Sequence, residues 1–150
     1  MRFAVLLTLA MATTSQAAAA TPPLGAGYGA IDATRDTDPV TLANAFCTAR
    51  IVDDMSTIAG HFAPKLELAL AEVPATQVPW QSLPDRPSSC SVEVLNGFDD
   101  TVGVLVRVTY KASDHTWSDT LNLERTPDTW LINNVFYENG GNLRFRLFEN

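Results

Sequence analysis

The sequence predicts an α+β fold, with N-terminal helices packed on a curved antiparallel sheet of about four strands. Between residues 38 and 73, apolar residues recur at spacings of three and four, the period of a helix with one buried face. From residue 90 onward the period changes to two, which is typical of strands. A proline-rich stretch at residues 73–90 separates the two regions. Helices followed by a run of strands favour one α+β domain.

The first twenty residues have the pattern of a bacterial secretory signal peptide. Arg2 supplies the positive start, residues 3–12 are apolar, and Ala17 and Ala20 each end a small-x-small cleavage site. The apolar run is about half of the roughly 20 residues that a membrane span needs, so the pattern disfavours an anchor. We expect cleavage near Ala17 to Ala20, a periplasmic or secreted protein, and no stable membrane anchor.

The rest of the chain is expected to form a leader and one domain. Residues 21–37 are rich in Pro, Gly, Ala and Thr, which indicates a flexible leader. Residues 38–150 are long enough for a single α+β domain with its own core. Loss of Arg2 leaves nine basic and seventeen acidic side chains, a net charge of −8. Such a chain repels phosphate backbones, so nucleic acid is not expected as a partner.

Two helices are expected at the start of the domain. Asp38 is a good cap for the first helix, and Pro39 suits its first turn. Asp53 and Asp54 are expected to bend or break the run, and Pro64 begins a second helix. The apolar stripe of the first helix consists of Leu42, Ala45, Phe46, Ala49 and Val52.

Four strands are expected after the proline-rich stretch, at residues 90–95, 101–111, 117–125 and 129–137. A turn that begins at Asn96 joins the first two. The fourth strand is apolar on both faces, which predicts a central strand covered by helices on one side. Its two expected faces are Trp130, Ile132 and Phe136 against Leu131, Val135 and Tyr137.

Cys47 and Cys90 are the two cysteines of the chain. In an oxidising compartment two cysteines of one domain usually pair, so we expect a disulfide. The alternatives are a metal pair and a free nucleophile. There is no CxxC spacing, and His61 and His115 are far apart in sequence. A bond between the cysteines would close a loop of about forty residues, worth roughly 3 to 4 kcal/mol.

Few polar residues are candidates for chemistry, and each also has a structural interpretation. Asp54 follows a helix with apolar neighbours, and either it or Asp53 could point into a pocket. A solvated helix end paired with Arg50 is the favoured interpretation of both acids. His61 lies at a helix break, where a surface or capping histidine is favoured.

Asn134 lies in the fourth strand beside large apolar residues, so we expect its side chain to be hydrogen-bonded, by default to backbone. Tyr110 and Tyr137 are expected at the edge of the core with hydrated hydroxyl groups. Asp99-Asp100 and the Asp114-His115 pair fall in turns without the oxygen-ligand spacing of a calcium loop. No phosphate-binding glycine loop, GxSxG or HExxH motif is present, so neither a cofactor nor a metal is expected.

The order of elements, and the ending WLINNVFYENGGNLRFRL at residues 130–147, resemble a family of small secreted bacterial domains of unknown function. Members of that family resemble the nuclear transport factor 2-like superfamily, in which helices pack in the concave face of a bent sheet to form a cone. The resemblance covers residues 38–150. It implies a short helix capped by Asn142, where the family pattern has serine, whereas periodicity alone leaves residues 142–148 open between helix and strand.

The resemblance brings no settled activity, so no catalytic residue is carried over. The favoured function is a non-catalytic module that binds a small molecule or a periplasmic protein. The alternative is a small pocket enzyme with isomerase- or dehydratase-like acid-base chemistry. The resemblance implies it, because some members of the superfamily use an Asp or His in an apolar pocket, and the candidates here are Asp54 and His61. A purely structural secreted protein is a third candidate. By analogy with cone folds, the outer sheet face is a candidate homodimer surface, carrying Arg107, Thr109, Thr120 and Asn122.

Overall fold

The structure is a computed structural model that describes residues 38–95 and 103–148. The expected signal peptide, the leader and the turn at residues 96–102 lie outside these ranges. The helical elements are α1 (Pro39–Val52), the 3-10 helix η1 (Met55–His61), α2 (Pro64–Ala71), the 3-10 helix η2 (Ala75–Gln77) and α3 (Leu143–Phe148). The strands are β1 (Ser89–Val94), β2 (Val104–Lys111), β3 (Thr116–Arg125) and β4 (Trp130–Phe136). The predicted α+β class is confirmed.

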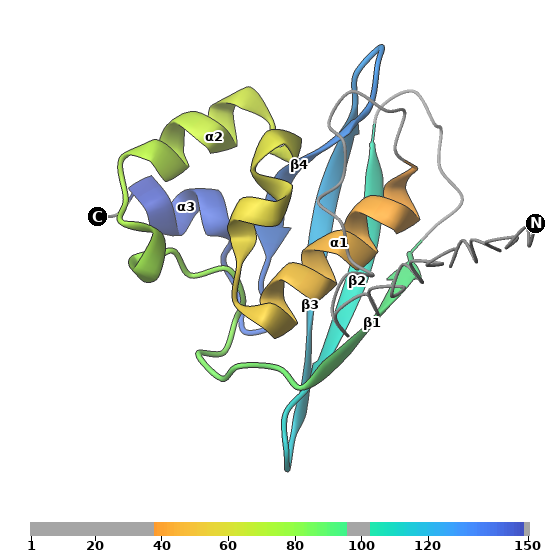
Figure 1. The fold of residues 1–150 in the computed structure, drawn as a ribbon, viewed down its shortest axis with the longest axis vertical. Coiled ribbons are helices and arrows are strands. Elements are labelled where there is room, and N and C mark those ends of the chain that lie inside the picture. The colour runs from red at the N-terminus through yellow and green to blue at the C-terminus, as the bar shows by residue number, and fades with distance from the viewer. Residues whose placement is uncertain (1–37, 96–102, 149–150) are drawn as a thin grey trace, which may run out of the picture.

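The four strands form one antiparallel sheet with the order β1-β2-β3-β4. Helix α1 lies against one face of this sheet, and α2 and α3 are grouped beyond β4 (Figure 1). The core lies between α1 and the sheet, where strands β2 and β3 turn alternate side chains inward. Its central residues are wholly buried and include Leu42, Phe46, Val106, Val108, Leu121 and Leu123.

The start and the end of α1 follow from local side-chain chemistry. The carboxylate of Asp38 accepts hydrogen bonds from the backbone N–H groups of Val40 (2.9 Å) and Thr41 (3.0 Å), as predicted for a helix cap. The helix ends at Asp53, whose φ of 61° places it in the left-handed region. The predicted break at the Asp53-Asp54 pair is therefore confirmed.

The buried stripe of α1 is rotated relative to the prediction. Val52 is exposed and Ala45 is only half-buried, whereas Ala43, Cys47 and Arg50 are buried. The predicted stripe contains only apolar residues, so it leaves out Arg50, which is buried. Arg50 lies three residues after Cys47, so it shares the face that packs toward the sheet.

The prediction of a central fourth strand was wrong, because β4 lies at the edge of the sheet and, among the described strands, pairs with β3 alone. Its free edge is covered by short segments that make isolated bridges to it. The backbone N–H of Ala63 donates to the carbonyl of Ile132 at 2.9 Å, and Phe136 bridges to Asn142. This cover explains why β4 is apolar on both faces although it lies at an edge.

A β-bulge in β4 also overturns the predicted division of its faces. Asn122 pairs with Asn134 and Leu123 pairs with Ile132, so one extra residue, Asn133, is inserted in β4. The insertion shifts the alternation by one residue. As a result Ile132 and Val135 are both wholly buried, whereas Phe136, predicted on the same face as Ile132, is exposed.

The last element is a helix, as the family resemblance implies for residues 142–148. Gly140 and Gly141 adopt φ values of 92° and 84°, and this turn returns the chain to β4. The side-chain oxygen of Asn142 accepts from the N–H of Phe145 at 3.0 Å, which makes Asn142 the expected cap. The side-chain oxygen of Asn134 accepts from the N–H of Arg144 at 3.1 Å. The side-chain amide nitrogen of Asn134 donates a hydrogen bond to the side-chain oxygen of Asn142 at 3.0 Å.

Cys47 of α1 and Cys90 of β1 form the predicted disulfide, with their Cα atoms 6.0 Å apart and a sequence separation of 43. The bond fastens the first helix to the first strand across the proline-rich segment. Within the described ranges, no helix has the length and apolar character that a membrane span requires. The disulfide is compatible with a secreted or periplasmic protein.

Reduction of the disulfide is expected to lower the free energy of unfolding by about 3 to 4 kcal/mol, because the bond restricts a long loop in the unfolded chain. Urea unfolding of residues 21–150, with and without reductant, measures this difference. The Cys47→Ala, Cys90→Ala double variant should match the reduced protein and should not respond to reductant. Equal midpoints for oxidised and reduced protein would contradict the prediction.

Asn134→Ala and Asn142→Ala are each expected to lower the free energy of unfolding by about 1 to 2 kcal/mol, because each leaves an N–H of the first turn of α3 unpaired. Their effects should be less than additive in the double variant, since the two side chains share one bond. Chemical denaturation measures all three variants. Asn44→Ala, on the exposed side of α1, is the control and should change stability little.

Candidate functional site

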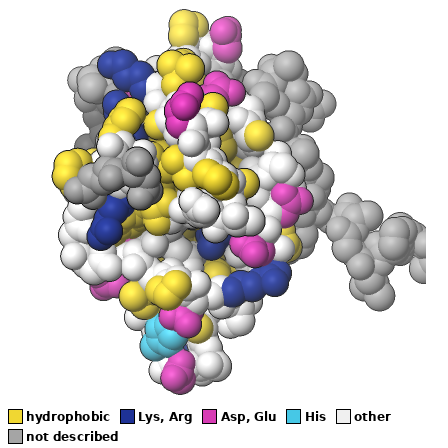
Figure 2. All heavy atoms as spheres, turned by 90° about the vertical axis from the view of Figure 1, so that its left-hand side faces the viewer, with side chains coloured by type: hydrophobic (Ala, Val, Ile, Leu, Met, Phe, Trp, Pro, Cys, Tyr) yellow, Lys and Arg dark blue, Asp and Glu magenta, His cyan; other side chains and the backbone are white. Residues whose placement is uncertain are grey.

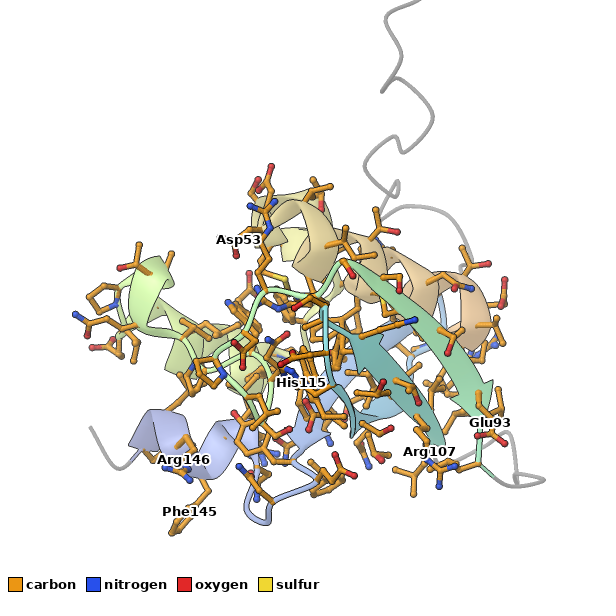
Figure 3. All side chains as sticks on the ribbon, turned by 90° about the horizontal axis from the view of Figure 1, so that it is seen from below. Asp53, Glu93, Arg107, His115, Phe145 and Arg146 are labelled. Atoms are coloured by element: carbon orange, nitrogen blue, oxygen red, sulfur yellow. A yellow bond between two sulfur atoms is a disulfide. The ribbon has the colours of Figure 1, made fainter. Side chains whose placement is uncertain are left out.

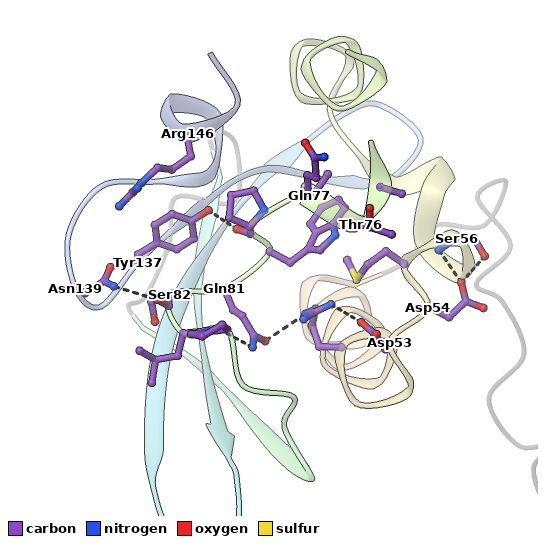
Figure 4. A pocket seen from close by; sticks show the side chains of 18 residues that line it. Asp53, Asp54, Ser56, Thr76, Gln77, Gln81, Ser82, Tyr137, Asn139 and Arg146 are labelled. Carbon is purple, nitrogen blue, oxygen red and sulfur yellow. Dashed lines mark hydrogen bonds and ion pairs between the residues drawn. The ribbon is translucent and has the colours of Figure 1, made fainter. Parts of the chain in front are cut away.

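A pocket of about 750 Å³ lies between the C-terminal end of α1, residues 75–84 and the region of Tyr137 and Arg146 (Figure 4). Residues 75–84 belong to the proline-rich segment that connects α2 to β1. The segment has little regular structure, so side chains from the rest of the protein fix its position. Those side chains are the polar residues that give the pocket its chemical character.

Arg50 is one of these polar residues and carries a positive charge. It lies in the last turn of α1 and is only 8% exposed. Its Nε donates to the side-chain oxygen of Gln81 at 3.2 Å, and its Nη1 lies 3.3 Å from a carboxylate oxygen of Asp53 (Figure 4). The favoured interpretation of Asp53, a helix end paired with Arg50, is confirmed. The pocket thus has a buried guanidinium in its wall.

Residues 80–85 are held from within as well as from α1. The amide nitrogen of Gln81 donates to the carbonyls of Leu83 (2.8 Å) and Asp85, which closes the segment on itself. The indole of Trp80 stacks on Phe62 with ring centroids 5.4 Å apart and meets Phe46 edge-on. This pocket wall is therefore anchored at both its polar and its apolar positions.

Asp119 fastens the same wall to the sheet. It lies in β3 and is 1% exposed. One carboxylate oxygen accepts from the N–H of Ser82 at 2.9 Å, and the other accepts from the N–H of Glu138 at 3.1 Å. Burial raises the pKa of Asp119, while the hydrogen bonds from Ser82 and Glu138 oppose the rise. Sequence reasoning missed Asp119. Its signal is its place on the apolar face of β3, between Trp117 and Leu121.

Tyr110 does not have the hydrated hydroxyl group predicted for it, and the hydroxyl of Tyr137 has a protein partner. Tyr137 donates its hydroxyl hydrogen to the carbonyl of Pro79. Tyr110 is wholly buried, and its hydroxyl has no hydrogen-bond partner within the described part of the chain. Burial, and after it the charge of Asp119, raises the pKa of both hydroxyl groups, and Arg50 opposes the rise at Tyr110. The error at Tyr110 comes from placing it at the edge of the core, whereas it lies wholly inside the core.

The three residues singled out for chemistry are not brought together. Asp54 lines the rim of the pocket, where it is exposed and accepts from the N–H of Ser56 at 3.0 Å. His61 does not line the pocket, and the expectation of a surface position was wrong because it is 1% exposed. Its burial follows from the bridge that places the neighbouring Phe62 beside Ile132. Asn134 bonds to backbone N–H groups, as expected by default.

A second histidine joins the far end of the proline-rich segment to the β2–β3 turn. The ring of His115 lies 2.7 Å from Asp114 through Nδ1 and 3.5 Å from Asp85 through Nε2, and it stacks on Trp117. The hydrogen bond to Asp114 raises the pKa of His115. Residues 38–95 and 103–148 contain no group of three or more His, Cys, Asp or Glu that could hold a metal.

Comparisons of the chain with models of protein families, with curated proteins and with solved structures give no match. The site is therefore interpreted from its own geometry. It combines a buried arginine, a buried tyrosine, Tyr137, and a buried aspartate, each bonded to the proline-rich wall, at the junction of α1, β3 and the turn after β4.

Asp119 is expected to take up a proton at a higher pH than an unfolded aspartate does. A pKa raised in the folded state makes this group favour folding most below the unfolded pKa, and the benefit is lost as the pH rises through the folded pKa. The side-chain carboxyl ¹³C shift of Asp119, followed by NMR as the pH is lowered from 7, measures the midpoint directly. A midpoint at or below the ordinary aspartate value would contradict the prediction.

Proposed function

We propose that this chain is an exported, non-catalytic module that binds a small molecule in the pocket behind residues 75–84. The pocket carries the proposal because its volume of about 750 Å³ lies in the range of small-molecule sites. Its walls combine apolar surface from Trp80, Pro79 and Met55 with polar groups from Arg50 and Gln81. This mixture of a few placed polar groups among apolar side chains is typical of ligand sites.

Preorganisation of the wall supports the same conclusion. The backbone of Ser82 and Pro79 is bonded to side chains from the sheet region: Asp119 binds the N–H of Ser82, Asn139 binds its carbonyl at 3.0 Å, and Tyr137 binds the carbonyl of Pro79. A wall held in this way needs little ordering when a ligand enters. Binding to a preformed pocket keeps more of the interaction free energy than binding to a mobile loop.

The pocket enzyme has less support from the arrangement of its two candidate residues. Asp54 faces solvent at the rim and accepts hydrogen bonds from Ser56, and His61 lies outside the pocket lining. The buried carboxylate that does adjoin the pocket wall, Asp119, already accepts a backbone N–H at each oxygen. A general acid or base needs a substrate proton within hydrogen-bond reach. The enzyme alternative therefore rests mainly on the family resemblance.

The nuclear transport factor 2-like cone is part of the proposal. It is supported in outline by a four-stranded antiparallel sheet with helices against one face. Export is supported by the disulfide between Cys47 and Cys90. An exported module with a pocket beside its sheet would meet its ligand in the periplasm or outside the cell.

Binding of another protein is a second candidate function, favoured by large apolar side chains exposed on α2 and α3. Leu68, Phe145 and Phe148 are 71%, 57% and 70% exposed. Figure 2 shows hydrophobic side chains across the face that carries these helices, interspersed with charged groups. Apolar residues scattered singly are common on soluble proteins, so this surface is weaker evidence than a formed pocket.

A protein-observed NMR screen of residues 21–150 with a fragment library tests the proposal. Binding fragments should shift the backbone amide signals of residues 75–84 together with those near Tyr137 and Arg146, because these segments enclose the pocket. Signals of the outer sheet residues Arg107 and Thr120 are the control and should stay unchanged. Shifts confined to α2 and the exposed side of α3 would favour the protein-binding surface, and a library without pocket binders would overturn the proposal.

A further inference from the structure

We propose that the pocket selects an anionic ligand, a small organic acid with a compact apolar body, whose carboxylate binds Arg50. The inference rests on the proposed binding function and adds a chemical class to it. It is drawn from the unused hydrogen-bonding capacity and the charge balance of Arg50, and from the position of a second arginine on the other side of the pocket.

The hydrogen-bond donors of Arg50 are only partly used. A guanidinium has five N–H donors. Gln81 occupies Nε and Asp53 lies at Nη1, whereas Nη2 has no acceptor among residues 38–95 and 103–148. Arg50 lines the pocket, so the remaining donors are available to a ligand there. Two parallel N–H donors of one guanidinium match the two oxygens of a carboxylate.

The charge of Arg50 is also only partly balanced. The side chain of Arg50 is 10% exposed, whereas its ion-pair partner Asp53 is 63% exposed at a distance of 3.3 Å. Water screens Asp53 more than it screens the buried guanidinium. Asp119, the buried acid near Tyr110, is committed to the N–H groups of Ser82 and Glu138. A carboxylate entering the pocket would therefore meet a buried cation with a net attraction.

The other side of the pocket carries a second arginine. Arg146 of α3 lines the pocket opposite the end of α1, and it is labelled on the far side of Tyr137 from Asp53 in Figure 4. Trp80, Met55 and Tyr137 supply apolar surface to the same pocket. The two acids of the lining already have partners, since Asp53 binds Arg50 and Asp54 binds Ser56. The arrangement favours an anion over a cation although the whole chain is acidic.

Three probes with one body and different charge test the inference: phenylacetate, phenylacetamide and phenethylammonium. Each is titrated into residues 21–150 at pH 7 and low salt, and the amide shifts of residues 75–84 and the Nε–H signal of Arg50 are followed by NMR. Phenylacetate is expected to bind about tenfold more tightly than phenylacetamide, because only the anion completes a charge-assisted pair. Phenethylammonium should bind most weakly.

Two variants assign the preference to Arg50. Arg50→Met should make phenylacetate and phenylacetamide bind with similar affinity. Arg50→Lys keeps the charge but loses the planar fork, so it should weaken phenylacetate several-fold and leave phenylacetamide unchanged. Arg107→Met is the matched control, because Arg107 pairs with Glu93 on the outer sheet face, far from Arg146 in Figure 3. If Arg50→Met does not fold, Arg50→Lys carries the test, with dispersed amide signals as the criterion of folding.

The outcomes separate this inference from the proposed function. Equal binding of phenylacetamide and phenylacetate, tighter binding of phenethylammonium, or an anion preference that survives at Arg50→Met would each overturn the anionic class while leaving a binding pocket. Failure of all three probes to shift the pocket signals would also overturn it, and the fragment screen would then decide separately whether the pocket binds anything. Loss of the preference at Arg50→Met, but not at Arg107→Met, supports it.

Discussion

The carboxylate of Asp119 joins the two irregular segments that enclose the pocket, and the site depends on this contact. One oxygen binds the N–H of Ser82 in the proline-rich segment, and the other binds the N–H of Glu138 in the turn after β4. Burying a charge carries a large desolvation penalty unless hydrogen bonds offset it. Two backbone donors offset it in part here, and the raised pKa of Asp119 indicates that desolvation still exceeds them. The contact is therefore specific and energetically expensive.

Local signals in the sequence predict much of the fold. Asp38 before Pro39 marks the start of α1, and the change of period from about 3.6 to 2 separates the helices from the sheet. The pairing of Cys47 with Cys90 follows from their number and the expected compartment. These features depend on neighbouring residues or on composition. They can be predicted without knowing which distant segments meet.

The prediction fails where a residue takes its role from a distant partner. Arg50 and Asp119 each lie on an apolar face. The structural role of a charged residue at such a position cannot be assigned until its partner is known. Gln81 is 31 positions from Arg50, and Ser82 is 37 positions from Asp119. The bulge at Asn133 is a similar case, because only the register against β3 reveals the extra residue. The candidate site was therefore the least predictable part of the molecule.

The buried polar groups of the pocket wall are better explained by specificity than by stability. Replacing a buried ionic network with apolar residues of similar volume is often neutral or stabilising. The core of α1 and the inner faces of β2 and β3 already supply extensive apolar burial, and the disulfide restrains the same loop. A chain that needed only to fold could have closed residues 75–84 with apolar contacts such as those of Trp80. Placing Arg50, Gln81 and Asp119 there fixes the wall in one position and leaves Arg50 in the lining of the pocket, as the proposed recognition of a charged ligand would require.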